Sequence, residues 1–114
     1  MLKRSYRLKK NRDFKEVFQQ GKSILNKYMV LYYRKNHLQK LRIGFTVSKK
    51  IGGAVVRNRI KRILREAVRK HILEMVSGID IILIARGTIK GIKSIEVEQY
   101  LVKLLEKNRL LKNR

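Results

Sequence analysis

The side chains best suited to a chemical task in this sequence are the basic ones of residues 52–70, a stretch that opens on Gly52 and Gly53. Apolar residues recur along it at intervals of three and four, which predicts an amphipathic helix. The apolar side of that helix holds Val56, Ile60, Ile63, Leu64, Ala67, Val68 and His71. The opposite side holds Asn58, Lys61, Arg62, Arg65 and Arg69, while Arg59 lies between the two sides and Arg57 at the edge of the apolar one.

A row of guanidinium and ammonium groups can bind the phosphates of a nucleic acid. The alternative is an ordinary solvated helix face, on which charges of opposite sign alternate and form pairs three or four residues apart. In this stretch only Glu66 interrupts the positive sign, so neighbouring charges repel one another until a polyanion neutralises them. We therefore favour nucleic-acid binding over the solvated face.

The composition of the whole chain agrees with a polyanionic partner. Thirty Lys and Arg against eight Asp and Glu leave a net charge of +22 over 114 residues. Self-repulsion on that scale destabilises a compact monomer, and a bound polyanion offsets it. The apolar content is sufficient for folding, and we expect one RNA-binding domain over residues 1–114, with basic ends at 1–10 and 109–114 whose composition allows flexibility.

Two absences in the sequence indicate the compartment. The chain has no cysteine, which excludes a disulfide framework and a thiol nucleophile and fits a reducing environment. No apolar run reaches the length of a membrane span, and the basic first residues are not followed by the apolar region of a signal peptide. We expect a cytoplasmic protein.

Residues that could perform catalysis are scarce. The acids and the two histidines do not show the spacing of a zinc site, and Gly52-Gly53 lacks the ending of a nucleotide-binding loop. A metal site built from Glu96 and Glu98 is disfavoured because no third acid lies nearby in sequence. His71 falls on the apolar side of the basic helix, where a structural role is expected. We therefore predict no catalytic residue and no metal site in this chain.

The first half of the chain predicts a short helix and three strands. Asn11 is a suitable N-cap for the helix and Gly21 a suitable end. The strands are expected near residues 22–25, 28–34 and 41–48, joined as an antiparallel meander.

The second half predicts two helices and one strand. The basic helix is expected over residues 54–75, with Gly78 as its C-terminal stop. Residues 79–85 are apolar except for one aspartate, a pattern typical of a central strand covered on both faces. After a loop at residues 86–93, Ser94 is expected to cap a last helix. The inner face of that helix holds Val97, Leu101, Leu104 and Leu105.

Three aromatic residues can either pack in the core or stack on nucleic-acid bases. Phe14 and Phe18 share one face of the first helix with Val17, because the three lie at i, i+3 and i+4 spacing. Core packing is the more common role for residues so placed, and a stacking surface is the alternative. Tyr32, in the second strand, is open to the same two interpretations.

With these residues laid out, the sequence resembles the bacterial ribonuclease P protein family. The main match is Arg57-Asn58-Arg59, which corresponds to the RNR signature of that family. The loop 87–93 is the least similar part. Other matching segments follow the order of the family along nearly the whole chain: residues 8–14 with Phe18 and Gly21, residues 47–52, and residues 81–86.

The resemblance implies an α/β (α+β) two-layer sandwich with a four-stranded mixed sheet, three helices and a left-handed βαβ crossover. It also implies the protein subunit of ribonuclease P, an endoribonuclease that matures the 5′ end of tRNA. In that family, magnesium bound to the RNA subunit performs the hydrolysis, so the protein is expected to bind no cofactor, no small-molecule substrate and no membrane. A ribosomal or other structural RNA-binding protein, and a small nuclease, are the alternatives.

Two binding surfaces follow from the same resemblance. The single-stranded 5′ leader of precursor tRNA is expected at Phe14, Phe18 and Tyr32, which reverses the preference for core packing. The catalytic RNA is expected at the basic helix and the turn before it. The positions that match on this side are Lys49, Lys50, Arg57, Asn58, Arg59, Lys61, Arg62, Arg65 and Arg69.

Overall fold

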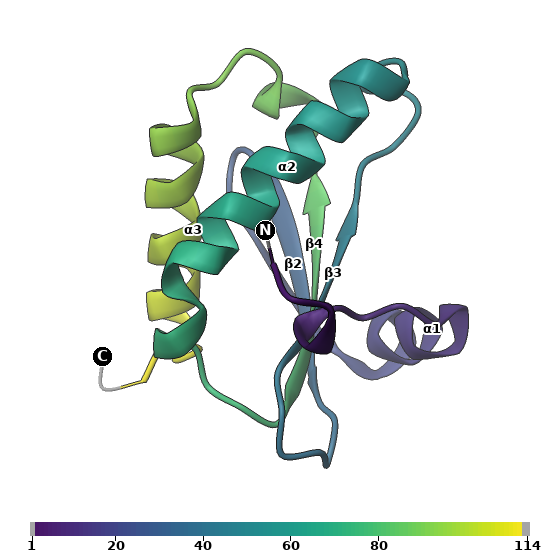
Figure 1. The fold of residues 1–114 in the computed structure, drawn as a ribbon, viewed down its shortest axis with the longest axis vertical. Coiled ribbons are helices and arrows are strands. Elements are labelled where there is room, and N and C mark those ends of the chain that lie inside the picture. Colours follow the sequence, from purple (N-terminus) through teal and green to yellow (C-terminus); the bar gives the residue numbers. More distant parts are fainter. Residues whose placement is uncertain (1, 113–114) are drawn as a thin grey trace.

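The computed structural model describes residues 2–112. This part of the chain contains α1 (Asn11–Gln20), β1 (Lys22–Leu25), β2 (Met29–Lys35), β3 (Arg42–Thr46), α2 (Ala54–His71), β4 (Ile79–Ala85) and α3 (Ser94–Lys107), in that order (Figure 1). Short 3-10 turns lie at Arg4–Tyr6, Ile72–Glu74 and Gly87–Ile89. The arrangement confirms an α+β fold with a four-stranded mixed sheet and three α-helices among the described residues.

The sheet has the strand order β1-β2-β4-β3. β2 is antiparallel to both β1 and β4, whereas β3 is parallel to β4. The predicted antiparallel meander is therefore wrong in its last step, because β4 lies between β2 and β3. Six of the seven residues of β4 are buried, so this strand gains most apolar burial from a place in the middle of the sheet.

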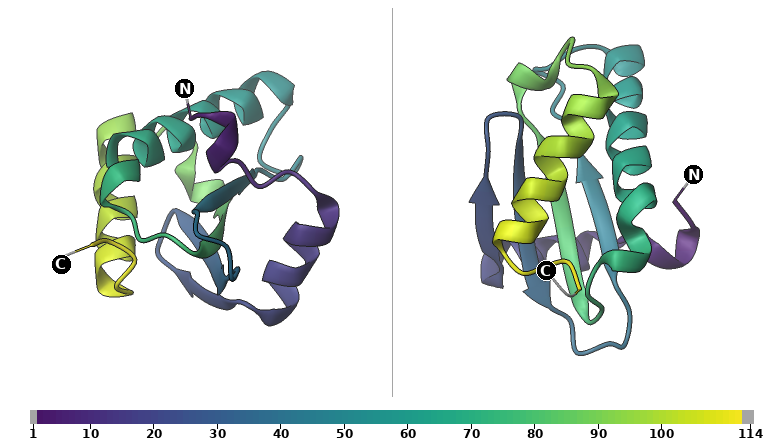
Figure 2. Two further views of the ribbon diagram at one scale, coloured as in Figure 1. Left: turned by 60° about the horizontal axis from the view of Figure 1, so that its bottom comes forward. Right: turned by 90° about the vertical axis from the view of Figure 1, so that its left-hand side faces the viewer.

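The connection from β3 through α2 to β4 is a left-handed crossover. In Figure 1 both strands run upward, α2 passes in front of them, and β4 lies to the left of β3. The right-hand view of Figure 2 places α2 beside α3, in front of the same face of the sheet. Nearly all β-α-β connections between parallel strands are right-handed, so this feature was predictable only through the family resemblance.

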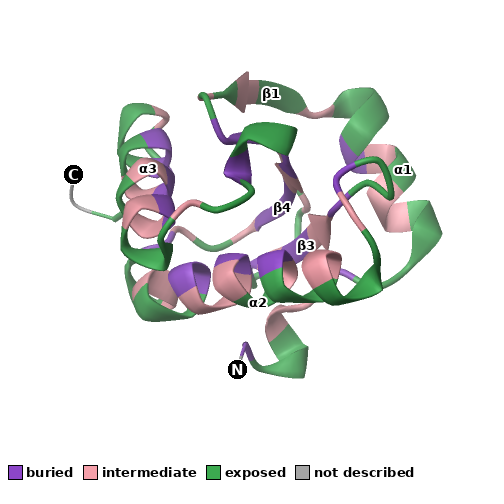
Figure 3. Cartoon of the chain, turned by 90° about the horizontal axis from the view of Figure 1, so that it is seen from above, coloured by how far each residue is buried: buried purple, intermediate pink, exposed green. Residues whose placement is uncertain are grey.

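The main core lies between the sheet and the helices α2 and α3 (Figure 3). Full burial of one aliphatic side chain of this kind stabilises a fold by about 1.5–3 kcal/mol. The strands contribute Met29, Leu31, Ile43, Ile81 and Leu83. The helices contribute Ile60, Leu64, Ala67 and Val68 from α2, and the four predicted residues Val97, Leu101, Leu104 and Leu105 from α3.

A second and smaller cluster lies on the other face of the sheet, under α1. Its buried members are Leu8, Val17 and Ile82, with Phe14, Tyr32 and Ile84 packed against them. Successive residues of a strand point to opposite faces, which is why Ile82 belongs to this cluster while Ile81 and Leu83 belong to the main core. α1 and the segment that holds Leu8 cover this face only in part, since Phe18 is 40% exposed.

Three helix boundaries differ from the predictions. The N-cap positions of α1 and α3 are Lys10 and Lys93, each one residue before the polar residue expected there, and neither side chain caps its helix. α2 ends at His71 and passes into the turn Ile72–Glu74. Gly78 does not stop the helix; it lies in the connection to β4 with φ of +78°, a conformation that favours glycine.

The basic ends are packed on the domain wherever the structure describes them. Leu2 and Leu8 are buried, and the Leu8 amide donates a hydrogen bond to the Ile43 carbonyl at 2.9 Å. Leu110 and Leu111 are buried beside the segment that follows α2. Residues 2–10 and 109–112 are therefore ordered against the domain, while residues 1, 113 and 114 lie outside the described range. No helix of the described residues is long and apolar enough to cross a membrane.

Candidate nucleic-acid interface

The basic residues of α2 form one surface because the opposite side of the helix is held in the core. Ile60, Leu64, Ala67 and Val68 fix the rotation of the helix about its axis. The basic residues and Asn58 turn toward solvent, and we call them the basic surface. It comprises the exposed Asn58, Arg59, Arg62 and Arg69 and the half-buried Arg57, Lys61 and Arg65.

Some of these side chains also have partners within the protein. Arg57 donates from Nε to the carbonyl of Gly52 at 3.2 Å, which ties the start of the helix to the turn before it. The Arg65 guanidinium lies 5.8 Å from the centre of the Phe45 ring, a cation–π contact with the sheet. Arg59 and Arg62 make no ion pair with any other described residue, so their charges are available to an external anion.

Glu66 is the one acid on α2. Arg69 donates to its Oε2 at 2.9 Å, and this hydrogen bond holds the pKa of Glu66 below its ordinary value. The carboxylate is therefore ionised at neutral pH and offsets the charge of Arg69, the last arginine of the helix. The positive charge of the basic surface is consequently strongest nearer the start of α2.

Lys49 and Lys50 occupy the turn that leads from β3 into α2. Both are exposed, and the Lys50 amide donates to Ser48 Oγ at 3.1 Å, which orders the turn. Their side chains extend the positive charge of the basic surface toward the end of β3. The structure therefore brings the basic positions predicted from the sequence onto one helix and the turn before it.

Phe14, Phe18 and Tyr32 meet on the opposite side of the sheet from the main core, and we call these three rings the aromatic surface. The three differ in exposure. Phe14 and Tyr32 are half-buried, whereas Phe18 is 40% exposed. The Phe18 ring stands edge-on against Tyr32, with ring centres 5.0 Å apart and an angle of 81° between the planes. Phe18 therefore presents much of its ring to solvent in a fixed orientation.

Gly44 explains how Phe14 reaches its position. This glycine of β3 is buried, and a Cβ atom added to it would lie 2.3 Å from Cζ of Phe14. The ring can lie against the strand only because position 44 has no side chain. Phe14 is therefore mainly a packing residue, whereas Phe18 belongs to an accessible surface.

Further apolar side chains share the face of the aromatic surface and were missed in the sequence. The strand pairing sets Leu25 opposite Val30 and Val30 opposite Ile84, on the same face as Tyr32. Leu25 is 62% exposed, and the other two are half-buried. Alternation within β2 could have indicated Val30, but Leu25 and Ile84 join it only through strand pairing.

An ion-pair network fastens α1 to the sheet beside the aromatic surface. The buried carboxylate of Asp80 accepts hydrogen bonds from Arg42 Nε at 2.8 Å and Nη2 at 2.7 Å, and from the Asn36 amide at 2.8 Å. The bond to Asp80 raises the pKa of Arg42 above its ordinary value. Arg42 also reaches Asp13 of α1 at 3.3 Å, and Arg34 of β2 reaches Glu16 at 2.8 Å. Residues far apart in sequence form this network, so no sequence motif indicates it.

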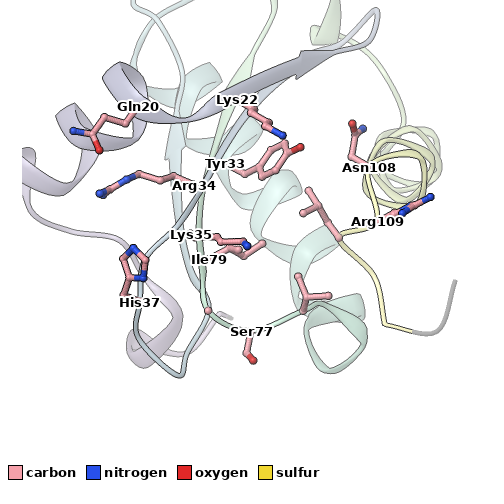
Figure 4. A pocket seen from close by; sticks show the side chains of 13 residues that line it. Gln20, Lys22, Tyr33, Arg34, Lys35, His37, Ser77, Ile79, Asn108 and Arg109 are labelled. Carbon is pink, nitrogen blue, oxygen red and sulfur yellow. The ribbon is translucent and has the colours of Figure 1, made fainter.

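The side chain of Tyr33, the neighbour of Tyr32, lies on a different part of the molecular surface. Its side chain lines a cavity of about 600 Å³ on the other face of the sheet (Figure 4). The wall also includes the segment before β4, residues 108–110 after α3, and Gln20, Lys22, Arg34, Lys35 and His37. The two tyrosines therefore cannot serve one surface, and Tyr32 alone belongs with Phe14 and Phe18.

The sequence predicted no catalytic role for His71 and no metal site at Glu98, and both residues have structural partners. His71 Nε2 lies 2.8 Å from Glu98 Oε2, which joins the end of α2 to α3, and this hydrogen bond lowers the pKa of Glu98 below its ordinary value. Lys70 lies 3.4 Å from the other oxygen of Glu98. No group of three or more histidines and acids within residues 2–112 is placed to hold a metal ion.

Known proteins resemble this chain along most of its length. The family model described as Ribonuclease P matches residues 2–109. The ribonuclease P protein component of Brevibacillus brevis is 44% identical over 110 residues, which cover 96% of this chain and 87% of that protein. The ribonuclease P protein component of Alkaliphilus metalliredigens is 43% identical over 105 residues, which cover 92% of this chain and 95% of that protein.

Solved structures agree with the sequence comparison. The RNase P protein of Staphylococcus aureus superposes with a TM-score of 0.86 at 36% identity, covering 94% of this chain and 98% of that one. The RNase P protein from Thermotoga maritima superposes with a TM-score of 0.82 at 35% identity, covering 89% of this chain and 96% of that one. This chain is therefore similar to ribonuclease P proteins in both its sequence and its fold.

Proposed function

Because this chain belongs to the ribonuclease P protein family, we propose that its two surfaces serve two RNA ligands, the catalytic RNA and the 5′ leader of precursor tRNA. The chain is the protein component of a bacterial ribonuclease P and serves the 5′ maturation of tRNA. A ribosomal or other structural RNA-binding role is not favoured, since the match to this family extends over residues 2–109.

The basic surface, with Lys49 and Lys50, contacts the catalytic RNA. The arginines and lysines of one helix face suit a series of backbone phosphates, and contacts of this kind position a protein on RNA without reading its sequence. The unpaired state of Arg59 and Arg62 among the described residues supports this role. The charge also makes the assembly strongly dependent on salt, because each phosphate contact releases counterions.

The aromatic surface contacts the leader. A leader is single-stranded, so its bases are free to stack on aromatic rings. The observation that carries this assignment is the exposed ring of Phe18, held edge-on against Tyr32 while its helix neighbour Val17 is completely buried. A ring kept in one orientation at the surface offers a base a stacking partner at little cost in conformational entropy.

The hydrolysis is carried by the RNA subunit with its bound magnesium, and the protein supplies binding and orientation. The acids of the chain support this division, because most of them are engaged in structural pairs. Asp80 and Asp13 bind Arg42, Glu16 binds Arg34, and Glu98 binds His71. Since the substrates are newly made RNA transcripts, we place this work in the cytoplasm.

Cleavage assays with purified components test the proposal. Protein freed of RNA should leave precursor tRNA uncut, while protein, RNA subunit and magnesium together should cut once at the mature 5′ end. Efficient cleavage by the RNA-free protein would assign the chemistry to this chain and overturn the proposal. A protein prepared in parallel with Arg59→Ala and Arg62→Ala serves as a control, since cleavage by a contaminating ribonuclease should be equally strong in it, whereas cleavage by this chain should weaken with its affinity for RNA.

A further inference from the structure

The cavity of about 600 Å³ beside Tyr33 belongs to neither the basic nor the aromatic surface. Its lining combines apolar side chains with cations and contains no acid. A nucleotide has matching chemistry, because the faces of its base are apolar and its phosphate is an anion. The apolar members of the lining are Tyr33, Val76, Ile79 and Leu110, and the charged members are Lys22, Arg34, Lys35 and Arg109.

A ring and several cations are available together in this cavity. The strand pairing sets Lys22 opposite Tyr33, so the two side chains share a face of the sheet, and Figure 4 shows both extending toward the end of α3. Arg34 points away from them and is held in its ion pair with α1. Lys22, Lys35 and Arg109 are exposed and form no ion pair with a described residue.

The backbone is strained at the same place. Within residues 2–112, His37 and Arg109 are the only non-glycine residues with positive φ, at +59° and +58°, and both line this cavity. Arg109 follows α3 at the position where a glycine is usual, since the Leu110 amide closes the helix on the Leu105 carbonyl at 2.9 Å. An arginine in this conformation costs free energy that a glycine would not. Such residues cluster at ligand sites, which supports a binding role for Arg109.

The cavity adjoins the aromatic surface around one edge of the sheet. β1 is the only strand between β2 and that edge, and Tyr32 and Tyr33 lie on opposite faces of β2. α1 ends at Gln20, which lines the cavity and lies two residues after Phe18. At Gly21 the chain passes so close to β2 that an added Cβ atom would lie 2.8 Å from the Tyr33 carbonyl oxygen. An RNA strand that continues past Phe18 and around β1 therefore meets the cavity.

The two edges of the sheet give such a strand a direction. The opposite edge is β3, which leads into Lys49 and Lys50 and so toward the basic surface. Phe14 packs against Gly44 of this same strand. Since the RNA subunit carries the hydrolysis, the leader nucleotides next to the cleavage site approach the aromatic surface from the β3 edge. The nucleotides farther from the cleavage site then reach the β1 edge.

From these observations we infer a second leader site, in which a base farther from the cleavage site stacks on Tyr33 while its flanking phosphates bind Lys22, Lys35 and Arg109. The inference rests on the proposed function of the aromatic surface. It makes the holoenzyme sensitive to leader length, because only a leader long enough to pass around β1 gains these contacts. Stacking on an aromatic ring tolerates any base, so the added affinity carries no sequence preference.

The first experiment locates the stacked base. The fluorescent base 2-aminopurine, which is quenched by stacking, is placed at successive leader positions of precursor tRNA, and its emission is read in the holoenzyme under conditions that block cleavage. Positions at the aromatic surface should lose their quenching in Phe18→Leu. At least one position farther from the cleavage site should keep it in Phe18→Leu and lose it in Tyr33→Leu. If no position depends on Tyr33, the second site is refuted.

The second experiment measures the affinity that the holoenzyme gains when the leader is lengthened past the aromatic surface. The parent should bind the longer precursor at least about fivefold more tightly, the scale of one base stack. Tyr33→Leu and Arg109→Gly should each lose most of this gain. Lys107→Gln removes an exposed charge of α3 two residues from Arg109, outside the cavity lining, and should keep it. An equal gain in the parent and both cavity variants, or no gain in the parent, would overturn the inference.

Arg109→Gly separates binding from folding. Glycine adopts a positive φ without strain, so the Tm of this variant should equal or exceed that of the parent while its affinity for the longer precursor falls. A purely structural arginine would give the opposite pair of results, a lower Tm and an unchanged gain from leader length. This variant keeps the test decisive even if Tyr33→Leu folds poorly.

Two outcomes separate this inference from the proposed function. If Phe18→Leu weakens the binding of short leaders while the cavity variants change nothing, the aromatic surface keeps its role and the second site does not exist. If the cavity variants weaken the affinity for the RNA subunit alone and leave the gain from leader length intact, the cavity contacts the catalytic RNA and the inference is wrong.

Discussion

The basic surface comes from a single helix and the turn before it, whereas the aromatic surface depends on four elements. On α2, one apolar side buried in the core is enough to turn every basic residue outward. On the other side of the molecule, Phe14 and Phe18 come from α1, Tyr32 from β2, Gly44 from β3 and the floor at Ile82 from β4. The first surface is local in sequence and the second is assembled by the fold.

This difference predicts how each surface responds to a substitution. A substitution on the basic surface removes one charge and leaves its neighbours in place, because each side chain acts almost independently. The aromatic surface depends on the position of α1, which Arg42 and Arg34 hold through Asp13 and Glu16. Loss of one support there should disturb all the rings together.

The largest effect is expected from Arg42→Ala. Asp80 is only 2% exposed, and the substitution leaves its carboxylate without the guanidinium that it binds through both oxygens. Breaking a buried pair in this way costs about 3–5 kcal/mol. Arg59→Ala, on the basic surface, should change the free energy of unfolding by less than about 0.5 kcal/mol. Urea unfolding of both variants checks the contrast, and similar losses would refute it.

A smaller loss is expected from Gly44→Ala. The new methyl group would overlap the Phe14 ring, since the ideal Cβ position lies 2.3 Å from Cζ. Overpacking of this kind costs about 1–3 kcal/mol. Adding Phe14→Leu should recover part of the loss, because a leucine side chain does not reach as far across the strand. A double-mutant cycle by thermal unfolding measures this coupling, and strictly additive effects would mean that the two residues do not meet.

The next effect concerns function rather than stability. Phe18→Leu should keep the fold and the affinity for the catalytic RNA, since the ring is 40% exposed. It should lower the preference of the holoenzyme for precursor over mature tRNA by about 1 kcal/mol or more, the scale of one base stack. Binding of the holoenzyme to tRNA with and without a leader gives the measurement.

Arg62→Ala is the matched variant for that experiment. It should weaken assembly with the catalytic RNA and leave leader preference unchanged in the holoenzyme that does assemble. Circular dichroism confirms the fold of both variants. If Phe18→Leu distinguishes leaders as the parent does, or if it unfolds the protein, the ring is a packing residue and the aromatic surface has no role in leader binding.

The smallest effect is expected at the far end of α2, where Glu98 joins α3 to His71. The hydrogen bond to His71 keeps the pKa of Glu98 below its ordinary value of 4.5. A carboxyl whose pKa is lowered by folding stabilises the protein above its unfolded-state pKa, and this contribution is lost as the pH falls through the folded-state value. The difference in stability between the parent and Glu98→Gln should therefore shrink as the pH falls below the ordinary value. Urea unfolding across this range is the measurement, and a difference that grows on acidification would contradict the assignment.

Much of this protein could be predicted from the sequence because the relevant information is local. Hydrophobic spacing within one segment predicts the helix α2, the strand at residues 79–85 and the inner face of α3. That inner face consists of Val97, Leu101, Leu104 and Leu105. The same spacing indicated the basic surface. The resemblance to the ribonuclease P protein family added the left-handed crossover, which no hydrophobic pattern contains.

The rest was decided by the tertiary structure, because it depends on pairings between distant segments. The place of β4 between β2 and β3 cannot be read from either neighbour, since an apolar strand is compatible with several positions in a sheet. The packing of residues 2–10 follows from the free edge of β3, which exists only after the sheet has formed. Gly44 beneath Phe14 and Arg42 between Asp80 and Asp13 are likewise contacts across the fold. The sequence by itself determined the apolar and the polar sides of α2 and α3, because hydrophobic spacing lies within one segment, and only the assembled sheet decided which side chains of different elements meet.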